Sequence, residues 1–155
     1  MLRLFQHCQS MTQAQARQEH PLALAFVGDC VFDLYIRTYV LGKNLNSHKM
    51  HFEAVKYVSA RAQAEAFHLI EGLLTEDELY IYRRGRNTKP TTVPKNAEVK
   101  DYRSATGLEA LVGYLFVTGQ NGRLDEIMEH IILRSGEQNA AYAENTEPQE
   151  REPRQ

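Results

Sequence analysis

Apolar residues fill positions 21–41 almost without a polar face, and the segment begins with Pro21, which suits the first turn of a helix. This pattern predicts a central buried helix that ends near Gly42. Across residues 47–74 apolar side chains return every three or four positions. That period predicts one long amphipathic helix.

The next signals mark a short helix and a connection. Thr75 and Glu78 have the spacing of a capping box, which predicts a helix that runs to about Tyr82. Residues 83–103 contain a glycine, two prolines and no apolar period. We therefore expect this segment to be a connection rather than a core element.

The last third of the chain again has helical periodicity. The apolar spacing predicts a packed helix over 104–118 that ends at Gly119, and then a final helix that stops by Gly136. There is no internal repeat and no convincing strand, so the expected fold class is all-α. We expect a helical domain over 1–138 and a disordered polar tail over 139–155.

Length and composition limit the classes of protein that are possible. The chain has 155 residues, of which 43% are hydrophobic and 25% charged, which favours one globular domain and excludes a wholly disordered or fibrous chain. Cys8 and Cys30 are too few for a disulfide framework and lack the spacing of a zinc site. The longest apolar stretch, 22–27, is too short to span a membrane. We expect a cytoplasmic protein with no membrane partner.

The net charge of −2 conceals an uneven distribution. Segment 83–103 carries seven basic residues against two acidic ones, a local charge of +5 on a chain that is otherwise acidic. Clustered cations favour binding of a polyanion through counterion release. The alternative is a solvated loop whose charges only keep it soluble. Pro90 and Pro94 stiffen the segment and lower the ordering cost of binding.

Asp29 lies in the middle of the first long apolar segment, where an ionised carboxylate needs compensation. Asp33 has Arg37 four residues later as a helix-surface partner. The residue four positions after Asp29 is Asp33, which has the same charge and cannot pair with it. A metal ion, a retained proton or a hydrogen bond to a neighbouring helix could each compensate Asp29.

Glu109 is the second carboxylate within a predicted helix, and Gly107 and Gly113 leave room around it. If helices 21–41 and 104–118 pack together, Asp29 and Glu109 can face one gap. Two such carboxylates repel unless a cation lies between them, and oxygen ligands suit Mg²⁺ or Mn²⁺. A metal site beside a basic segment points to phosphodiester chemistry.

Several segments together resemble one enzyme family. Residues 22–37, LALAFVGDCVFDLYIR, resemble the ribonuclease III signature built around LGDAVL, and residues 105–116, ATGLEALVGYLF, resemble its second acidic motif. Gly28 and Asp29 fall on the Gly-Asp of the first motif, and Glu109 on the Glu of the second. LNSHKMHFEAVKYVSARAQAEAF, RRGRNTKP and PKNAEVKDYRSATG are similar to the short bacterial subgroup called mini-ribonuclease III. The resemblance covers roughly residues 20–134.

The chain departs from the longer members of that family at two acidic positions. Their further Glu and Asp correspond here to Ala25 and Thr106. The resemblance therefore implies that Asp29 and Glu109 are the catalytic pair and the Mg²⁺ ligands, with Mn²⁺ as a possible substitute. We also expect the protein to lack the double-stranded-RNA-binding domain of the longer relatives.

The resemblance implies a homodimeric endoribonuclease that cuts double-stranded RNA and leaves 5′-phosphate ends, with a stem flanking precursor 23S ribosomal RNA as the substrate. Double-stranded RNA is read mainly by shape, so a short cationic loop can dock it. The expected RNA-contacting residues are Arg83, Arg84, Arg86, Asn87, Lys89, Lys95 and Asn96. One alternative is a non-catalytic double-stranded-RNA-binding protein of the same fold, which the neutral Ala25 and Thr106 favour. A helical module that binds another protein would explain neither Asp29 nor the basic segment.

Overall fold

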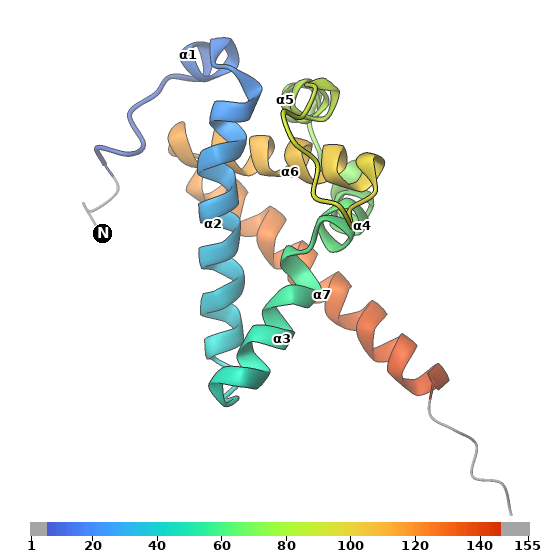
Figure 1. Cartoon of the computed structure of the whole chain (residues 1–155). Helices are drawn as coiled ribbons and strands as arrows, with labels where there is room; N and C mark the ends of the chain where they lie inside the picture. Colours follow the sequence, from blue (N-terminus) through green and yellow to red (C-terminus); the bar gives the residue numbers. More distant parts are fainter. Residues whose placement is uncertain (1–5, 147–155) are drawn as a thin grey trace, which may run out of the picture.

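The computed structural model describes residues 6–146 and builds them from helices and their connections (Figure 1). No strand occurs within these residues, and the all-α prediction is confirmed. In chain order the elements are α1 (Gln13–Gln18), α2 (Pro21–Leu41), α3 (Ser47–Val58), α4 (Ala60–Ile70), the 3-10 helix η2 (Glu71–Leu73), α5 (Glu76–Asn87), α6 (Val99–Val117) and α7 (Asn121–Thr146).

Helix α6 is the centre of the molecule. It packs against α1, α2, α4, α5 and α7, and Leu108, Leu111 and Leu115 are completely buried. Burial of each of these leucine side chains stabilises the folded state by about 1.5–3 kcal/mol, because it removes apolar surface from water. Figure 1 shows α2 running across α6, with α3 returning along the far half of α2.

Helix α2 has the predicted bounds, with Pro21 in its first turn and Gly42 as its C-cap. The prediction that α2 is buried on all sides is wrong. One side packs into the core through Phe32 and Ile36, whereas Phe26 is 78% exposed and Leu34 is 58% exposed. A helix that is apolar all round in sequence can therefore leave an apolar face uncovered in a single chain.

The predicted long helix over 47–74 is divided at Ser59. The backbone of Ser59 is extended, its amide closes the end of α3, and its hydroxyl accepts a hydrogen bond from the Ala62 amide at the start of α4. A serine that can cap the next helix competes with continuation of the first one. Phe52 and Val55 of α3 are exposed, so the apolar positions of this segment do not all face the core.

Segment 83–103 is helical at its two ends, over 83–87 and 99–103, so its assignment as a connection is wrong there. Helix α5 continues to Asn87 and α6 already begins at Val99. The buried Gly85 lies against α6, where a Cβ atom on it would be 2.9 Å from the Cβ of Ala110. This close packing holds the last turn of α5 in place, although the basic residues around it give no apolar period.

Helix α7 is also longer than predicted. It passes Gly136 and continues to Thr146, and Figure 1 shows its last turns extending away from the body of the fold. The predicted tail is thus helical over 139–146, and residues 147–155 lie outside the described part of the chain. Within 6–146 no helix combines the length and the apolar character needed to cross a membrane.

The predicted capping box at the start of α5 is confirmed. The Thr75 hydroxyl accepts from the Glu78 amide, and the Glu78 carboxylate accepts from the Thr75 amide. The same buried carboxylate accepts two hydrogen bonds from Arg123 of α7, at 2.8 and 2.9 Å. Glu78 therefore joins α7 to α5 as well as capping its own helix.

Candidate functional site

Helices α2 and α6 cross with their backbones in contact. A Cβ atom on Gly28 would lie 2.6 Å from the carbonyl carbon of Glu109 and 2.8 Å from the amide nitrogen of Gly113. A Cβ atom on Gly113 would lie 2.8 Å from the carbonyl carbon of Leu24. No side chain fits at either position, so the crossing requires glycine on both helices. It places Asp29, the residue after Gly28, beside Glu109.

The carboxyl groups of Asp29 and Glu109 are close enough to share a hydrogen bond. Asp29 is exposed to solvent, whereas Glu109 is partly buried. Burial and, second, the charge of Asp29 raise the pKa of Glu109 to about 8. A pair of carboxylates that resists carrying two charges is a place where a bound cation is favourable.

The geometry agrees with the expectation that Asp29 and Glu109 face the same gap. It differs in which of the two carboxylates is costly to ionise. Sequence reasoning placed the costly buried charge at Asp29. In the structure Glu109 is the more buried of the two carboxylates, and Asp29 is accessible. The predicted Asp33–Arg37 pair is confirmed, with 2.6 Å between Arg37 Nε and Asp33 Oδ2.

Gln63 of α4 is a residue of this site that sequence reasoning missed. It is only 2% exposed, and its side chain forms a hydrogen bond with Glu109 that opposes the rise in the pKa of that carboxyl. A signal was available in the sequence. Gln63 lies three and four residues before the buried Ala66 and Phe67, which makes it a polar residue at a core position.

The carboxylate pair fits a divalent cation with hard oxygen ligands. Magnesium commonly binds proteins through one or two carboxylates and completes its octahedron with water and substrate phosphate oxygens. Within residues 6–146 there is no cluster of three or more His, Cys, Asp or Glu side chains placed to hold a metal. A divalent ion bound at the crossing would take Asp29 and Glu109 as its protein ligands, and the exposed side of Asp29 leaves room for the others.

The two positions that are acidic in longer relatives contribute no ligand here. Ala25 is buried and apolar. The Thr106 hydroxyl is also buried and donates to the Tyr102 carbonyl at 2.9 Å. Both positions are occupied by packing or by a backbone contact, which leaves Asp29 and Glu109 as the acidic side chains at the crossing.

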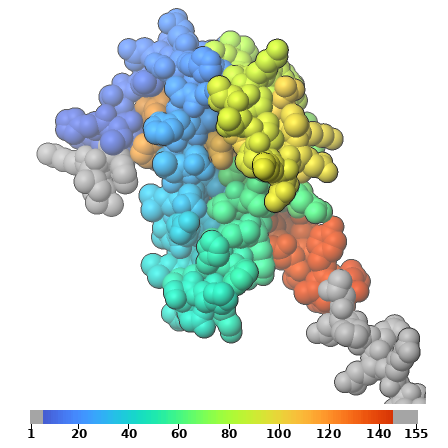
Figure 2. All heavy atoms as spheres, viewed as in Figure 1, coloured from blue at the N-terminus to red at the C-terminus, as the bar shows by residue number. Residues whose placement is uncertain are grey.

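The residues predicted to contact RNA divide into two groups. Arg84 is bound into the fold, because its guanidinium donates to the backbone carbonyls of Arg17 and Glu19 and lies near the Tyr80 ring. Arg86 also lies over a ring, that of Tyr82, but it stays exposed and belongs to the second group. The exposed members are Arg83, Arg86, Asn87, Lys89, Lys95 and Asn96. Figure 2 shows α5 and the loop 88–98 gathered on the surface beside α2.

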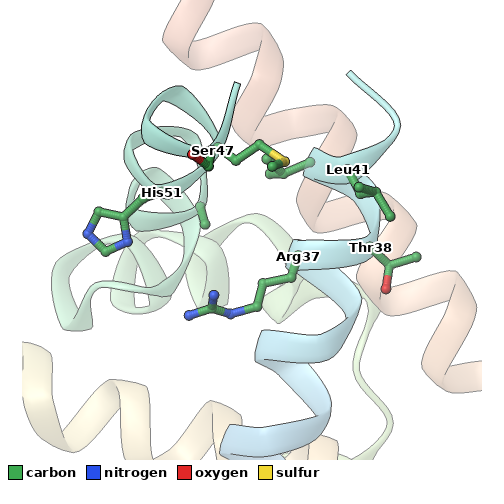
Figure 3. A pocket seen from close by; sticks show the side chains of 8 residues that line it. Arg37, Thr38, Leu41, Ser47 and His51 are labelled. Atoms are coloured by element: carbon green, nitrogen blue, oxygen red, sulfur yellow. The ribbon is translucent and has the colours of Figure 1, made fainter. Parts of the chain in front are cut away.

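A separate small pocket lies between the end of α2 and the start of α3 (Figure 3). Arg37, Ser47 and His51 contribute polar groups to its wall, and Arg37 is the residue that pairs with Asp33. Arg37 lies eight residues after Asp29, about 12 Å along the helix axis. Neither carboxylate of the crossing lines this pocket.

The raised pKa of Glu109 predicts a pH dependence of stability in the absence of divalent metal. Folding raises this pKa from an ordinary value of 4.5 to about 8, so the folded state holds the proton more tightly than the unfolded state. The stabilising contribution is complete below pH 4.5 and is lost as the pH rises through 8. Urea unfolding in EDTA should show this decline, and Glu109→Gln should remove it.

The control for this titration is the wild-type protein with added Mg²⁺. Saturating Mg²⁺ should restore stability at pH 8, because the cation offsets the repulsion between the two carboxylates. A Glu109→Gln variant that kept the full decline between pH 5 and 9 would show that another group causes it.

Comparisons with known proteins agree with the geometry. The family whose sequence model matches this chain is the ribonuclease III domain, over residues 22–120. This range contains nearly all of both helices of the crossing. A crystal structure of a protein from Fusobacterium nucleatum superposes with a TM-score of 0.71 at 29% sequence identity, and the match covers 82% of this chain and 99% of that one. The fold and the crossing therefore define a ribonuclease III domain.

Curated relatives give a narrower assignment. A mini-ribonuclease 3 of Clostridium tetani is 39% identical over 88% of this chain and 92% of its own length. One from a Thermoanaerobacter species is 47% identical over 83% of this chain and 92% of its own length. The chain belongs to the mini-ribonuclease III family.

Proposed function

We propose that the protein is a divalent-metal-dependent endoribonuclease that cuts double-stranded RNA, with Asp29 and Glu109 as metal ligands. The observation that carries this proposal is the meeting of the two carboxylates at the α2–α6 crossing, one exposed and one partly buried with its pKa raised to about 8. Membership of the mini-ribonuclease III family supports it.

The chemistry follows from the donor set. Asp29 and Glu109 would hold Mg²⁺, which would supply Lewis-acid chemistry at the scissile phosphate and at the attacking water. Glu109 is held between two helices and contributes a fixed oxygen ligand, whereas the exposed Asp29 faces the side from which a phosphate can approach. Hydrolysis that expels the 3′ oxygen leaves 5′-phosphate and 3′-hydroxyl ends.

The experiment that tests this function is incubation of end-labelled duplex RNA with the protein in Mg²⁺, in Mn²⁺ and in EDTA. Cleavage in Mg²⁺ that stops in EDTA supports the proposal. Binding of the duplex without cleavage under any metal condition would favour the non-catalytic RNA-binding alternative. A stem from precursor 23S ribosomal RNA is the substrate that we propose, and an unrelated duplex of equal length is the matched control.

The expected RNA contacts come from exposed basic residues in the second half of α5 and in the loop 88–98. Replacement of Arg83, Lys89 and Lys95 by alanine should weaken duplex binding and reduce the slope of log K against log salt by about 1 for each phosphate that the protein no longer neutralises. Arg84 is left intact in this variant because it bonds to the backbone of α1 and its C-cap. The measurement is fluorescence anisotropy over a range of salt concentrations.

The control for the loop variant is Arg134→Ala, which removes an exposed cation on α7 that pairs with Glu137. Its salt slope should equal that of wild type. An unchanged slope in the triple variant would mean that the loop charges only keep the segment soluble.

We propose that the active protein is a homodimer, formed through the uncovered apolar face of α2. Phe26 and Leu34 line a broad groove with Phe116 of α6 and with Ile132 and Leu133 of α7. A two-fold symmetric contact uses the same patch on both subunits, and it would bury the side chains that a single chain leaves exposed. It would also supply two cleavage sites for the two strands of a duplex.

Phe26→Asp should dissociate this dimer, because a charge would be buried in an apolar contact. The expected loss is about 2 kcal/mol or more, roughly a 30-fold weaker association. Sedimentation equilibrium measures the mass, which should fall toward the 17.8 kDa of one chain. Phe52→Asp is the matched control, since Phe52 is exposed on α3 outside the groove. A wild-type protein that is monomeric at all concentrations would contradict the proposal.

A further inference from the structure

Gln63 is an unusual residue for the interior of this fold. Within the described residues the buried polar or charged side chains are Gln63, Glu78, Ser104 and Thr106. A buried amide without a hydrogen-bond partner destabilises the folded state, so a glutamine at a core position requires a reason.

The other three buried polar side chains hold the fold together. Glu78 caps α5 and binds Arg123, Ser104 bonds to the Tyr82 hydroxyl at 2.9 Å, and Thr106 bonds to a carbonyl of its own helix. Gln63 differs from them because its side chain bonds to Glu109, one of the two carboxylates at the helix crossing.

The position of Gln63 follows from the local sequence. Ser59 caps α4, and the alanines on both sides of Gln63 keep the helix slim where it packs against α6. The amide of Gln63 therefore reaches Glu109 from a third helix, while Asp29 approaches it from α2. Glu109 therefore has neighbours from two different helices, and of the two only the neutral Gln63 amide can stabilise its ionised form.

We propose that Gln63 is a positioning residue that fixes the Glu109 carboxylate for divalent-metal binding, an inference that rests on the proposed function. An ionised carboxylate only accepts hydrogen bonds, so the Gln63 amide nitrogen donates to one oxygen of Glu109. The other oxygen is left for the cation. Because the amide is neutral, it orients the ligand without adding a positive charge that would repel the metal.

The test is Gln63→Met, which keeps the length and volume of the side chain and removes both donors. The readout is the dissociation constant for Mn²⁺, measured by electron paramagnetic resonance on the protein without RNA. Loss of a group that orients a metal ligand typically weakens metal binding about 10–100-fold. The Mg²⁺ concentration for half-maximal RNA cleavage should rise by the same factor, and saturating Mg²⁺ should largely restore the rate.

Two controls separate positioning from stability. Ser104→Ala removes a buried hydrogen bond of α6 that does not involve Glu109, and it should lower the thermal midpoint without changing Mn²⁺ affinity. Gln63→Asn keeps an amide but is one methylene too short to reach Glu109, and it should weaken Mn²⁺ binding as Gln63→Met does. If both Gln63 variants failed to fold, Gln63 would be a structural residue and the inference would be overturned.

Asp29→Asn and Glu109→Gln in the same assay distinguish the two ways in which the inference can fail. If either variant binds Mn²⁺ as wild type does, the proposed metal site itself is wrong. If both lose Mn²⁺ binding while Gln63→Met retains wild-type affinity, the metal site stands and only the role of Gln63 is overturned.

Discussion

Asp29→Asn should abolish RNA cleavage while the protein folds and binds duplex RNA as before. Asparagine keeps the shape of the side chain but removes the charge, and therefore one of the two anionic metal ligands. A metal ion contributes several kcal/mol of transition-state stabilisation, so the expected loss is about 10³-fold or more in single-turnover rate with Mg²⁺. Since Asp29 is exposed, the substitution creates no cavity.

The matched control for Asp29→Asn is Asp33→Asn, one turn later on the same helix. Asp33 forms an ion pair with Arg37 on the helix surface, and such pairs contribute only about 0.3–0.5 kcal/mol. Asp33→Asn should therefore cut RNA at close to the wild-type rate. Cleavage by Asp29→Asn at the wild-type rate in Mg²⁺ would show that the metal assignment is wrong.

Gly28→Ala should have the largest effect on stability. The added Cβ atom would lie 2.6 Å from the Glu109 carbonyl carbon and even closer to its oxygen, and both are backbone atoms in the centre of the fold. Helices α2 and α6 would have to separate, which costs more than about 3 kcal/mol because overpacking here cannot be relieved by a rotamer change. Urea unfolding measures the loss, and failure to fold is consistent with it.

Gly136→Ala provides the control for Gly28→Ala. Gly136 also lies within a helix, but a Cβ atom there would meet no atom within 4 Å. Alanine is the better helix former, so this variant should gain about 0.5–1 kcal/mol. If Gly28→Ala were as stable as wild type, α2 and α6 could not cross as closely as described, and the meeting of Asp29 and Glu109 would lose its basis.

The elements that the sequence predicted well are those whose signals are local. The bounds of α2 follow from Pro21 and Gly42, and the capping box of Thr75 and Glu78 is present as expected. The sequence failed where packing between segments distant along the chain decides the outcome. The last turn of α5 is helical because Gly85 packs against α6, and no local period announces that packing.

The candidate site shows the same division. The motifs around Asp29 and Glu109 selected the two carboxylates without any structural information. Which of them is buried, and which third residue touches them, could not be inferred from spacing along one chain. The packing of α4 against α6 brings Gln63 to Glu109, and the same packing places Glu109 where its pKa rises to about 8.

By itself the sequence determined the all-helical class and the family, and it selected the two acidic residues of the candidate site, because periodicity, caps and motifs lie in neighbouring positions. The tertiary structure alone decided that Gly28 and Gly113 let two backbones touch and that Gln63 lies beside Glu109. It also decided that α2 keeps one apolar face uncovered. These features depend on which helix faces lie against each other, and that is a property of the whole packed chain.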